Sequence, residues 1–470
     1  MIQDATALAE AIRVGSLSAS EAMQASLQAA GDHEALGAIV HLDREMGEST
    51  ARAMDRERAL EPQLFLKRPF GGVPTLAKDL GGPFAGLPVA AGSCLLPRVP
   101  SDADSDLARR FRDAGFCPFG LTTSPEFGLS LASEPAIGPI CRNPLDPSRT
   151  PGGSSGGAAA AVAAGIVAAA HATDAGGSIR VPAACCGLVG LKPGRGVMPA
   201  GPAFGNHLGG IASEFVVTRS VRDAVVAFAA LRGRARGPYA DAQPVTVDDT
   251  SLRIGILADT GRTHATTAER GGAAQAAAVA LERRGHTLSP LDWADFAGMV
   301  DVSGKVFGDI VSVNLAALFD LLDLDPEQAE PLTRAFVARG RAMSAAVLWE
   351  SMNAGVRVSR DLWRIFDEVD VVVAPMLASA PLAIGAFPSD HGDAGRQIDR
   401  MTAFAPLAAL ANISGFPAIA IPFGMDAGGM PLPVQLIAPF GHEPLLLALA
   451  ARLEAEGRWQ HRFPVAGLAA

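Results

Sequence analysis

The chain has 470 residues, of which 49% are hydrophobic and 19% are charged, and its formal net charge is −10. This length accommodates one large α/β domain or two or three average domains, and the apolar content is sufficient for a large core. No basic patch large enough to bind nucleic acid is visible, and the acidic excess mainly supports solubility, so no nucleic-acid partner is expected.

Targeting and redox features indicate a cytoplasmic protein. The segment Met1–Ala5 has neither the positive region nor the apolar region of a signal peptide. The alanine-rich run at 157–170 is too short and too weakly apolar to span a membrane, so no membrane association is expected. The cysteines are odd in number and lack zinc-ligand spacing, which indicates reduced thiols. They are Cys94, Cys117, Cys141, Cys185 and Cys186.

The first 60 residues are expected to be helical and to pack outside the core. Ser18 and Glu21 form the S-x-x-E pattern of a capping box, which predicts a helix from Ser18 through Ala30. A second amphipathic pattern predicts a helix over 43–60.

Lys78 is one of only four lysines in the chain, and it ends an apolar run that has glycines before and after it. Most other cations are arginines, and only a lysine amine can lose its proton at accessible pH. Two interpretations remain open from the local sequence. Lys78 is either a desolvated amine held in its neutral form or a surface ion pair with Asp79 at the end of a strand.

Beyond Lys78 the patterns alternate between helices and strands. Helices are expected at 105–114, from 220 onward, at 268–284, through most of 307–363, at 401–411 and at 443–456. Strands are expected at 116–121, 188–191, 252–257, 369–375, 418–422 and 433–437. The Gly-, Arg- and Pro-rich stretch at 232–249 is expected to be a linker or surface loop. The alternation is typical of an α/β protein with a mixed, largely parallel sheet.

Two glycine-flanked serine clusters, at 152–157 and 174–180, enclose a helix of small residues. The first cluster alone fits a flexible linker or the G-x-S-x-G nucleophile elbow. A helix follows it at once, which argues against a linker, and the proline-rich segment 143–151 is not the strand that an elbow needs. In the second cluster Ser178 follows two glycines, beside N–H groups that suit an oxyanion hole.

Other nucleophiles and metal centres find little support. Cys185 or Cys186 as a nucleophile lacks an evident histidine partner, and small buried thiols are the common case. No metal or other cofactor is expected, because the histidines show no ligand spacing. Those considered are His171, His207, His264 and His286.

Taken together, the motifs resemble the amidase signature family over nearly the whole chain, most weakly at 232–365. They are the Lys78 segment, the 152–157 loop, the D-x-G-G-S-I-R segment at 174–180, Asn412-x-x-Gly415-x-Pro417 and Pro433-x-Gln435. The separation of Ser154 and Ser178 is that of the family's cis-serine and nucleophile. The resemblance implies a central, mixed and mostly parallel β-sheet covered on both faces by α-helices.

The same resemblance implies one amidase domain over 1–470. Its expected parts are an N-terminal helical segment at 1–60, a signature core at 61–231, a variable and mainly helical insertion at 232–365, and a part at 366–470 that returns to the core sheet.

The resemblance also implies a Ser–cis-Ser–Lys triad. Ser178 would be the nucleophile, Ser154 the bridging cis-serine and neutral Lys78 the base that takes the proton through Ser154. The N–H groups of four residues would form the oxyanion hole, namely Ala175, Gly176, Gly177 and Ser178. Three further residues would hold the loop rather than react, namely Ser155, Asp174 and Arg180.

The expected activity is hydrolysis of a small-molecule or oligomeric amide through a Ser178 acyl-enzyme. Carbamate (urethane) or ester hydrolysis would use the same triad and stays open. An amidotransferase A subunit, which releases ammonia from glutamine, fits less well, because Val181, Cys185 and Gly194-Arg195 depart from its pattern and look closer to stand-alone hydrolases of the cyclic-dimer nylon hydrolase and aryl acylamidase type. The expected partner is a small-molecule substrate, and the expected state is a monomer or homodimer.

Overall fold

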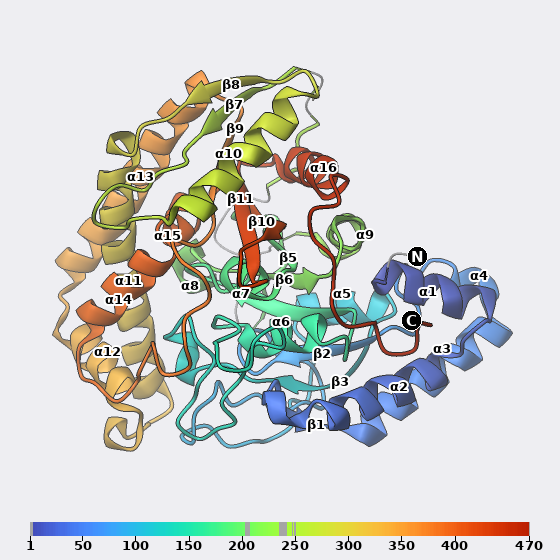
Figure 1. Cartoon of the computed structure of the whole chain (residues 1–470). Coiled ribbons are helices and arrows are strands. Elements are labelled where there is room, and N and C mark those ends of the chain that lie inside the picture. The colour runs from blue at the N-terminus through green and yellow to red at the C-terminus, as the bar shows by residue number, and fades with distance from the viewer. Residues whose placement is uncertain (1–2, 203–206, 235–241, 247, 249–250, 470) are drawn as a thin grey trace.

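The computed structural model describes residues 3–202, 207–234, 242–246, 248 and 251–469. Within them, one large and one small β-sheet lie among helices (Figure 1). The expected linker at 232–249 falls partly outside the described residues.

The large sheet has eight strands in the order β4-β6-β5-β10-β11-β9-β7-β8. It draws strands from residues far apart in the chain, including two, β7 and β8, from the segment that the sequence predicted to be mainly helical. The strands are β4 Ala169–Asp174, β5 Val189–Lys192, β6 Ser213–Thr218, β7 Arg253–Ile256, β8 Thr287–Pro290, β9 Val371–Pro375, β10 Ala418–Met425 and β11 Pro431–Ile437.

The sheet is mixed, as predicted, but the expectation that it is mostly parallel is wrong. Only the β9–β7 and β7–β8 pairs are parallel, and every other neighbouring pair is antiparallel. The prediction assumed that strands joined by helices become neighbours. Here β6 inserts between β4 and β5 and runs against both, and β10 and β11 form a hairpin.

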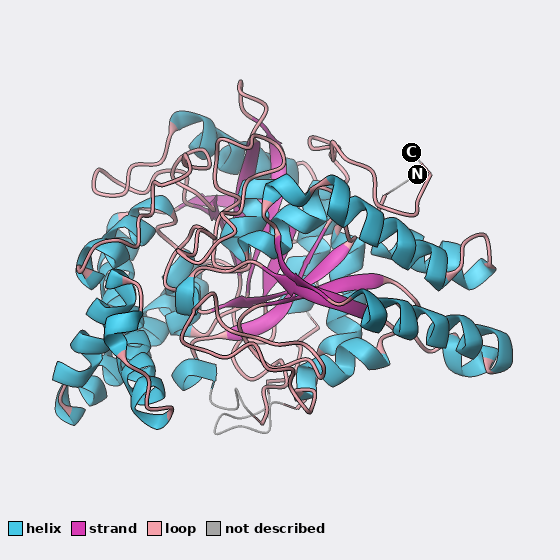
Figure 2. Ribbon diagram, turned by 90° about the horizontal axis from the view of Figure 1, so that it is seen from below, coloured by secondary structure: helices cyan, strands magenta, loops and turns pink. Residues whose placement is uncertain are grey.

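Helices cover both faces of this sheet, as predicted. Along β9, Val371 and Val373 belong to one hydrophobic cluster, whereas Val372 and Ala374 belong to a second. Because successive side chains of a strand point to opposite faces, the two clusters lie on opposite sides of the sheet. Figure 2 shows the strands enclosed between helices on both sides.

The helices confirm most of the predicted positions. The capping box is present, since the Ser18 side chain accepts from the Glu21 N–H and the Glu21 carboxylate accepts from the Ser18 N–H. The helices are α1 Ala5–Val14, α2 Ala19–Asp32, α3 Arg44–Leu60, α4 Pro62–Phe65, α5 Asp106–Asp113, α6 Gly156–Ala163, α7 Arg180–Cys186, α8 His207–Gly210, α9 Val221–Leu231, α10 Ala268–Glu282, α11 Ala294–Leu321, α12 Pro331–Ala342, α13 Ala345–Glu368, α14 Ala394–Phe404, α15 Ala408–Ser414 and α16 Glu443–Glu454, with short 3-10 turns at Glu34–Leu36, Glu126–Gly128 and Pro326–Gln328.

One predicted helix is two. The sequence predicted a single helix over 401–411, but α14 ends at Phe404 and α15 begins at Ala408. Pro406 lies between them. Proline lacks the N–H that a helix interior requires and disfavours helical geometry at the preceding residue, so the chain breaks there.

The N-terminal segment contains a strand that the sequence analysis missed. β1, Ile39–Leu42, pairs antiparallel with β3, Cys117–Thr122, and β3 pairs parallel with β2, Pro74–Lys78. The expectation that the first helices pack outside the core is also wrong, because Ile12 of α1 and Met23 of α2 are fully buried in the larger hydrophobic cluster. The small sheet matters for function because β2 ends at Lys78.

Among the described helices, α11 alone is long and apolar enough to cross a membrane by length and composition. Half of its apolar window is buried within the protein, and α11 packs against α12, α13, α14 and α15. A core helix passes the same test, so this composition is weak support for a membrane span.

Candidate active site

Lys78 is a buried amine and does not form the alternative surface ion pair with Asp79. Every residue of β2 is buried, and Lys78 itself is 1% exposed. Its Nζ donates to Ser154 Oγ at 2.7 Å and to Thr173 Oγ1 at 2.8 Å. Burial lowers the pKa of Lys78 to about 7, against the opposing pull of the Asp174 and Glu214 carboxylates. The amine therefore changes its protonation state near neutral pH.

Asp79 faces a different part of the protein from Lys78. Its buried carboxylate accepts from the N–H groups of Ala90 and Gly92 and lies 3.1 Å from the Arg98 guanidinium. Asp79 thus fixes the loop after β2, and the negative charges that act on Lys78 come from β4 and β6 instead.

Ser154 lies in a buried loop that is neither a linker nor a nucleophile elbow. The Gly153–Ser154 peptide bond is cis, as the family resemblance implied. Ser133 holds this loop from outside, because its hydroxyl donates to the carbonyls of Gly152 and Ser154 and accepts from the Gly156 N–H. The stretch before the loop contains no strand of either sheet, so the strand–turn–helix of an elbow is absent from this described segment.

Ser178 lies between β4 and α7, next to the first serine loop. The Ser155 N–H donates to the Ser178 carbonyl at 3.3 Å, and the Ser155 hydroxyl bonds to both backbone groups of Thr173. Ser155 therefore ties the two serine clusters to each other and to β4. Ser178 and Ser154 both line one cavity, with Ser178 8% exposed.

The backbone around Ser178 offers fewer free donors than the sequence predicted. The Gly177 N–H donates to the Asp174 carboxylate at 2.7 Å, so it is not available to an oxyanion. Glycine is required at position 177 for the backbone itself. Its φ is +117°, and a Cβ there would lie 2.8 Å from the Ala408 side chain. No partner among the described residues binds the N–H groups of Ala175, Gly176 or Ser178. These three remain as candidate oxyanion donors.

Asp174 and Arg180 form the buried anchor of this loop. The Arg180 guanidinium binds the Asp174 carboxylate through Nε at 2.9 Å and Nη2 at 3.1 Å. It also donates to Gln435 Oε1 and Asn412 Oδ1, the two polar residues of the C-terminal motifs. Burial alone would raise the pKa of Asp174, but the Arg180 charge and hydrogen bonds hold it well below its usual range.

Asn412 completes the anchor from α15. Its amide nitrogen donates to the backbone and side-chain oxygens of Asp174 and to the Ile211 carbonyl. Arg180 of α7 and Asn412 of α15 thereby meet at the Asp174 carboxylate, and Gln435 of β11 joins them through Arg180. This network aligns the N–H groups near Ser178, which agrees with the expected supporting role of Asp174 and Arg180.

The sequence analysis assigned no role at this site to four polar residues around Lys78 and the loop. Thr173 binds the Lys78 amine, and Ser133 binds the Ser154 loop. His171 accepts from the Lys78 N–H, and Glu214 lies next to His171. Thr173 and His171 precede the second serine cluster on the same strand, which was the available signal. No signal for Glu214 was present in the sequence, because only the pairing of β4 with β6 brings this residue close to His171 and Thr173.

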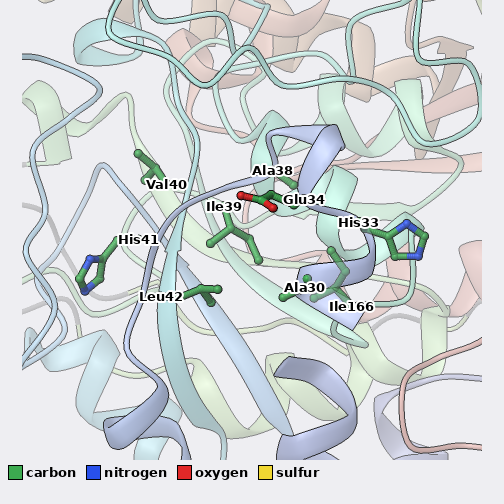
Figure 3. A pocket seen from close by; sticks show the side chains of 10 residues that line it. Ala30, His33, Glu34, Ala38, Ile39, Val40, His41, Leu42 and Ile166 are labelled. Atoms are coloured by element: carbon green, nitrogen blue, oxygen red, sulfur yellow. The ribbon is translucent and has the colours of Figure 1, made fainter. Parts of the chain in front are cut away.

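The cavity above Ser154 and Ser178 has a volume of about 450 Å³ and is lined mainly by apolar side chains. A second hollow, of about 400 Å³, lies along β1 and the end of α2. Figure 3 shows its two imidazoles, His33 and His41, at opposite sides and pointing away from each other. Because its polar groups do not converge, we place the chemistry at the first cavity.

Other chemistries remain unsupported. In the described part of the chain, no group of three or more His, Cys, Asp or Glu side chains could hold a metal ion. The five cysteines are free, and burial raises the pKa values of Cys185 and Cys186 far from the range in which a thiolate would form.

Comparisons with known proteins agree with this geometry. The family model described as Amidase matches residues 21–447. A 6-aminohexanoate-cyclic-dimer hydrolase from Paenarthrobacter ureafaciens is 32% identical over 504 residues, which cover 98% of this chain and 96% of the relative. A putative amidase, AmiC, from Mycobacterium tuberculosis is 32% identical over 97% of this chain and 95% of its own length.

Solved structures show the same fold. A 6-aminohexanoate cyclic dimer hydrolase superposes with a TM-score of 0.89 at 30% identity, covering 98% of both chains. A bacterial aryl acylamidase of the amidase signature family has a TM-score of 0.86 at 24% identity, covering 100% of this chain and 99% of its own, and adds evidence for the fold alone. The chain therefore belongs to the amidase signature family and is an amide-cleaving hydrolase.

Proposed function

We propose that the protein hydrolyses a small-molecule amide through an acyl-enzyme on Ser178. The observation that carries this proposal is the 2.7 Å contact between Lys78 Nζ and Ser154 Oγ at the floor of the cavity that Ser178 lines. Because the Lys78 side chain is buried, a neutral amine there would receive a proton through a hydroxyl that it contacts, and we assign this role to Ser154.

In the first half of the reaction, Ser178 Oγ attacks the amide carbonyl carbon and its proton passes to Ser154, whose own proton passes to Lys78 Nζ. The carbonyl oxygen becomes an oxyanion, which the N–H groups of Ala175, Gly176 and Ser178 can bind. Loss of one such donor typically costs about 2.7–4 kcal/mol of barrier. The proton then returns through Ser154 to the leaving nitrogen, and the amine departs.

In the second half, a water molecule takes the place of the amine. Lys78 and Ser154 accept its proton while its oxygen attacks the acyl carbon, and the proton returns to Ser178 as the acid leaves. The cycle ends with the original protonation states, so it consumes water and needs no cofactor.

The experiment that tests this function is direct detection of the acyl-enzyme. The protein is mixed with an activated aryl ester or aryl carbamate that acylates quickly and deacylates slowly, and its intact mass is measured. We expect the mass to rise by one acyl group, mapped to the peptide that contains Ser178 and absent from Ser178→Ala. A label on another residue, or turnover retained by Ser178→Ala, would contradict the proposal.

Carbamates and esters are the second class of substrate for this site, because the same acyl transfer cleaves them. A panel of amides, anilides, carbamates and esters with one common acyl group ranks the classes by kcat/KM. A glutaminase assay tests the amidotransferase alternative. We further propose a cytoplasmic single-domain enzyme, monomeric or homodimeric, that acts away from membranes and nucleic acid.

A further inference from the structure

One face of α11 forms a wall of the cavity that contains Ser154 and Ser178. The residues of this face recur every three or four positions, as neighbours on one side of a helix do. They include Phe307, Val311, Asn314, Leu315, Leu318 and Leu321. Apolar side chains that follow β2 and β3 in the chain, including Leu80, Val89 and Phe127, line further parts of the cavity.

The cavity contains no charge of its own among the described residues. Its polar side chains are Ser154, Thr173 and Ser178 at the reactive end and Asn314 on α11. A substrate that carried a charge into this cavity would lose its hydration and find no opposite charge, which is costly. Apolar groups, in contrast, would leave water for an apolar surface, which is favourable.

We propose that this cavity selects uncharged amides with an apolar acyl chain and rejects amides whose acyl chain ends in a charge. The inference rests on the proposed function, because it takes Ser178 as the point of attack. The cavity volume of about 450 Å³ suits a small molecule of this kind.

The test uses a series of p-nitroanilides from acetyl to octanoyl. We expect kcat/KM to rise about fourfold for each added methylene until the cavity is full. Replacing the terminal methyl of a mid-length chain by a carboxylate or an ammonium group should lower kcat/KM by more than about a hundredfold. A flat series, or equal rates for charged and neutral chains, would overturn the inference.

A variant of the wall sharpens this test. Leu318→Asp adds a negative charge at a partly exposed wall position, so the preference for the ammonium-ended chain over the neutral chain should rise at least about tenfold. Val302→Asp is the matched control, because it makes a comparable change on an exposed surface of the same helix, outside the cavity lining. Equal changes of preference in both variants would contradict a selective wall.

Binding to Ser178→Ala separates the two proposals. If this variant binds neutral chains by calorimetry and charged chains far more weakly, the cavity inference stands even where turnover is absent. If both kinds of chain turn over equally and only with Ser178 present, the cavity inference fails and the proposed function stands. Turnover that persists in Ser178→Ala makes the proposed function fail.

A second, independent observation concerns the backbone of Lys78. The Lys78 N–H donates to His171 Nδ1 at 3.2 Å, so the proton of the neutral imidazole lies on Nε2. His171 Nε2 lies 3.4 Å from Glu214 Oε1, which also accepts from the Gly82 N–H at 2.7 Å. The side chains of His171 and Glu214 are both 1% exposed. The two side chains therefore lie in contact, with His171 of β4 bonded to Lys78 of β2 and Glu214 of β6 bonded to the loop after Lys78.

β4 holds Lys78 at two points. His171 and Thr173 are two residues apart on this strand, so their side chains share one face. His171 binds the Lys78 main chain and Thr173 binds its amine at 2.8 Å. We propose that His171 and Glu214 are positioning residues that hold Lys78 against Ser154 and help to set its charge state.

The charges that face Lys78 come from several elements. Asp174 of β4 and Glu214 of β6 both favour the protonated amine, while burial disfavours it more strongly. Arg180 of α7 is bound to Asp174, and Asp79 is bound to the loop at 90–98. Removing the Glu214 charge should therefore lower the pKa of Lys78 further and leave its amine neutral at more acidic pH.

The test is the pH dependence of kcat/KM for Glu214→Gln, which keeps an acceptor for the Gly82 N–H. We expect the acid limb to move toward lower pH, by up to about one unit. Glu282→Gln, an exposed glutamate of α10, is the matched control and should leave the profile in place. A Glu214→Gln profile that superposes on the wild-type profile would overturn the charge role.

Two variants of His171 test the positioning role. His171→Asn keeps an acceptor for the Lys78 N–H, whereas His171→Leu removes it at similar volume. We expect His171→Asn to retain at least about ten times the kcat of His171→Leu, with similar KM values. Equal kcat values in two folded variants would overturn the positioning role. Activity retained by Lys78→Ala would instead contradict the proposed base, which separates this inference from the proposed function.

Discussion

The signature core and the α11 region lie on two sides of the same cavity and differ in how their residues are held. In the core, α6 is buried along its whole length, and Asp174 and Arg180 are buried and hydrogen-bonded to each other and to Asn412 of α15. On α11, Asn314 and Leu321 are exposed. The core therefore fixes the atoms proposed to react, whereas α11 offers exposed positions, such as Asn314 and Leu321, outside this hydrogen-bonded network.

From this difference we expect the core to determine the rate of reaction and the α11 face to determine which substrates are preferred. A change in the core should alter turnover of every substrate by a similar factor, because all substrates share the attacking serine and its base. A change on the α11 face should alter the order of substrates and leave the best turnover number nearly constant. Figure 1 shows α11 with α12–α14 on the side of the molecule opposite the N-terminal helices α1–α4.

The largest expected effect is that of Ser178→Ala. Removing the nucleophile should lower kcat by at least about 10⁴-fold for every substrate, with the order of substrates no longer measurable. Ser178 is small and partly solvent-accessible, so the fold should persist, which circular dichroism checks. Residual turnover at a tenth of the wild-type rate would place the reacting atom elsewhere. It would also contradict the view that the core carries out the reaction and α11 selects the substrate.

Substitution of Lys78 should be nearly as damaging. Lys78→Arg should lose about as much activity as Lys78→Ala, because a guanidinium keeps its charge and cannot give up its proton. If Lys78→Arg kept most of the activity, the lysine would serve as a fixed cation and the relay through Ser154 would be wrong.

The wild-type pH profile tests the same base. Burial lowers the pKa of Lys78 to about 7, so the amine is protonated and inactive below that pH and neutral above it. We expect kcat/KM to rise through a single ionisation near pH 7 and to stay high on the alkaline side, for every substrate alike. A profile that falls through this range, or whose midpoint differs between substrates of equal charge, would contradict a shared base.

The residues proposed to react could be named from the sequence because the family motifs are local. Ser154, Ser178 and Lys78 each lie in a short segment whose glycines or apolar neighbours mark it. The sequence placed Asp174 in the supporting group without showing that its carboxylate accepts from the Gly177 N–H, which the resemblance had assigned to the oxyanion hole.

The missed features depend on contacts between distant segments. His171 and Glu214 meet only because β6 pairs with β4, and the same insertion of β6 makes the predicted parallel sheet antiparallel there. The α11 face could not be identified because the helix is apolar on more than one side, and burial against α12–α15 conceals which side lines the cavity. Long-range packing, and not local propensity, decides these features.

A smaller effect is expected for Asn412→Ala. The change removes the amide that binds Asp174 and the acceptor for Arg180, so it leaves buried polar groups short of partners and should destabilise the fold by about 1–3 kcal/mol. Displacement of the loop should lower kcat by up to about a hundredfold with little change in KM. Urea unfolding and steady-state kinetics measure the two effects.

Asn353→Ala, on the α13 helix that packs against α11, is the matched control for this substitution and should leave both kcat and stability near wild type. An Asn412→Ala protein that changes substrate order instead of kcat would mean that the anchor and the α11 wall are not separate in function.

The smallest expected effect is that of a metal chelator, which should leave kcat/KM unchanged for all substrates. The side chains nearest Lys78 that could bind a metal already have partners: His171 Nδ1 accepts from the Lys78 N–H, and the Asp174 carboxylate accepts from Arg180, Gly177 and Asn412. A metal ion would have to displace these bonds and would repel the nearby cations. Activity assayed after dialysis against EDTA, with and without added Zn²⁺, checks this. If dialysis removed the activity and Zn²⁺ restored it, the reaction would depend on a metal ion in addition to the side chains of the core. The serine mechanism would then have to be revised.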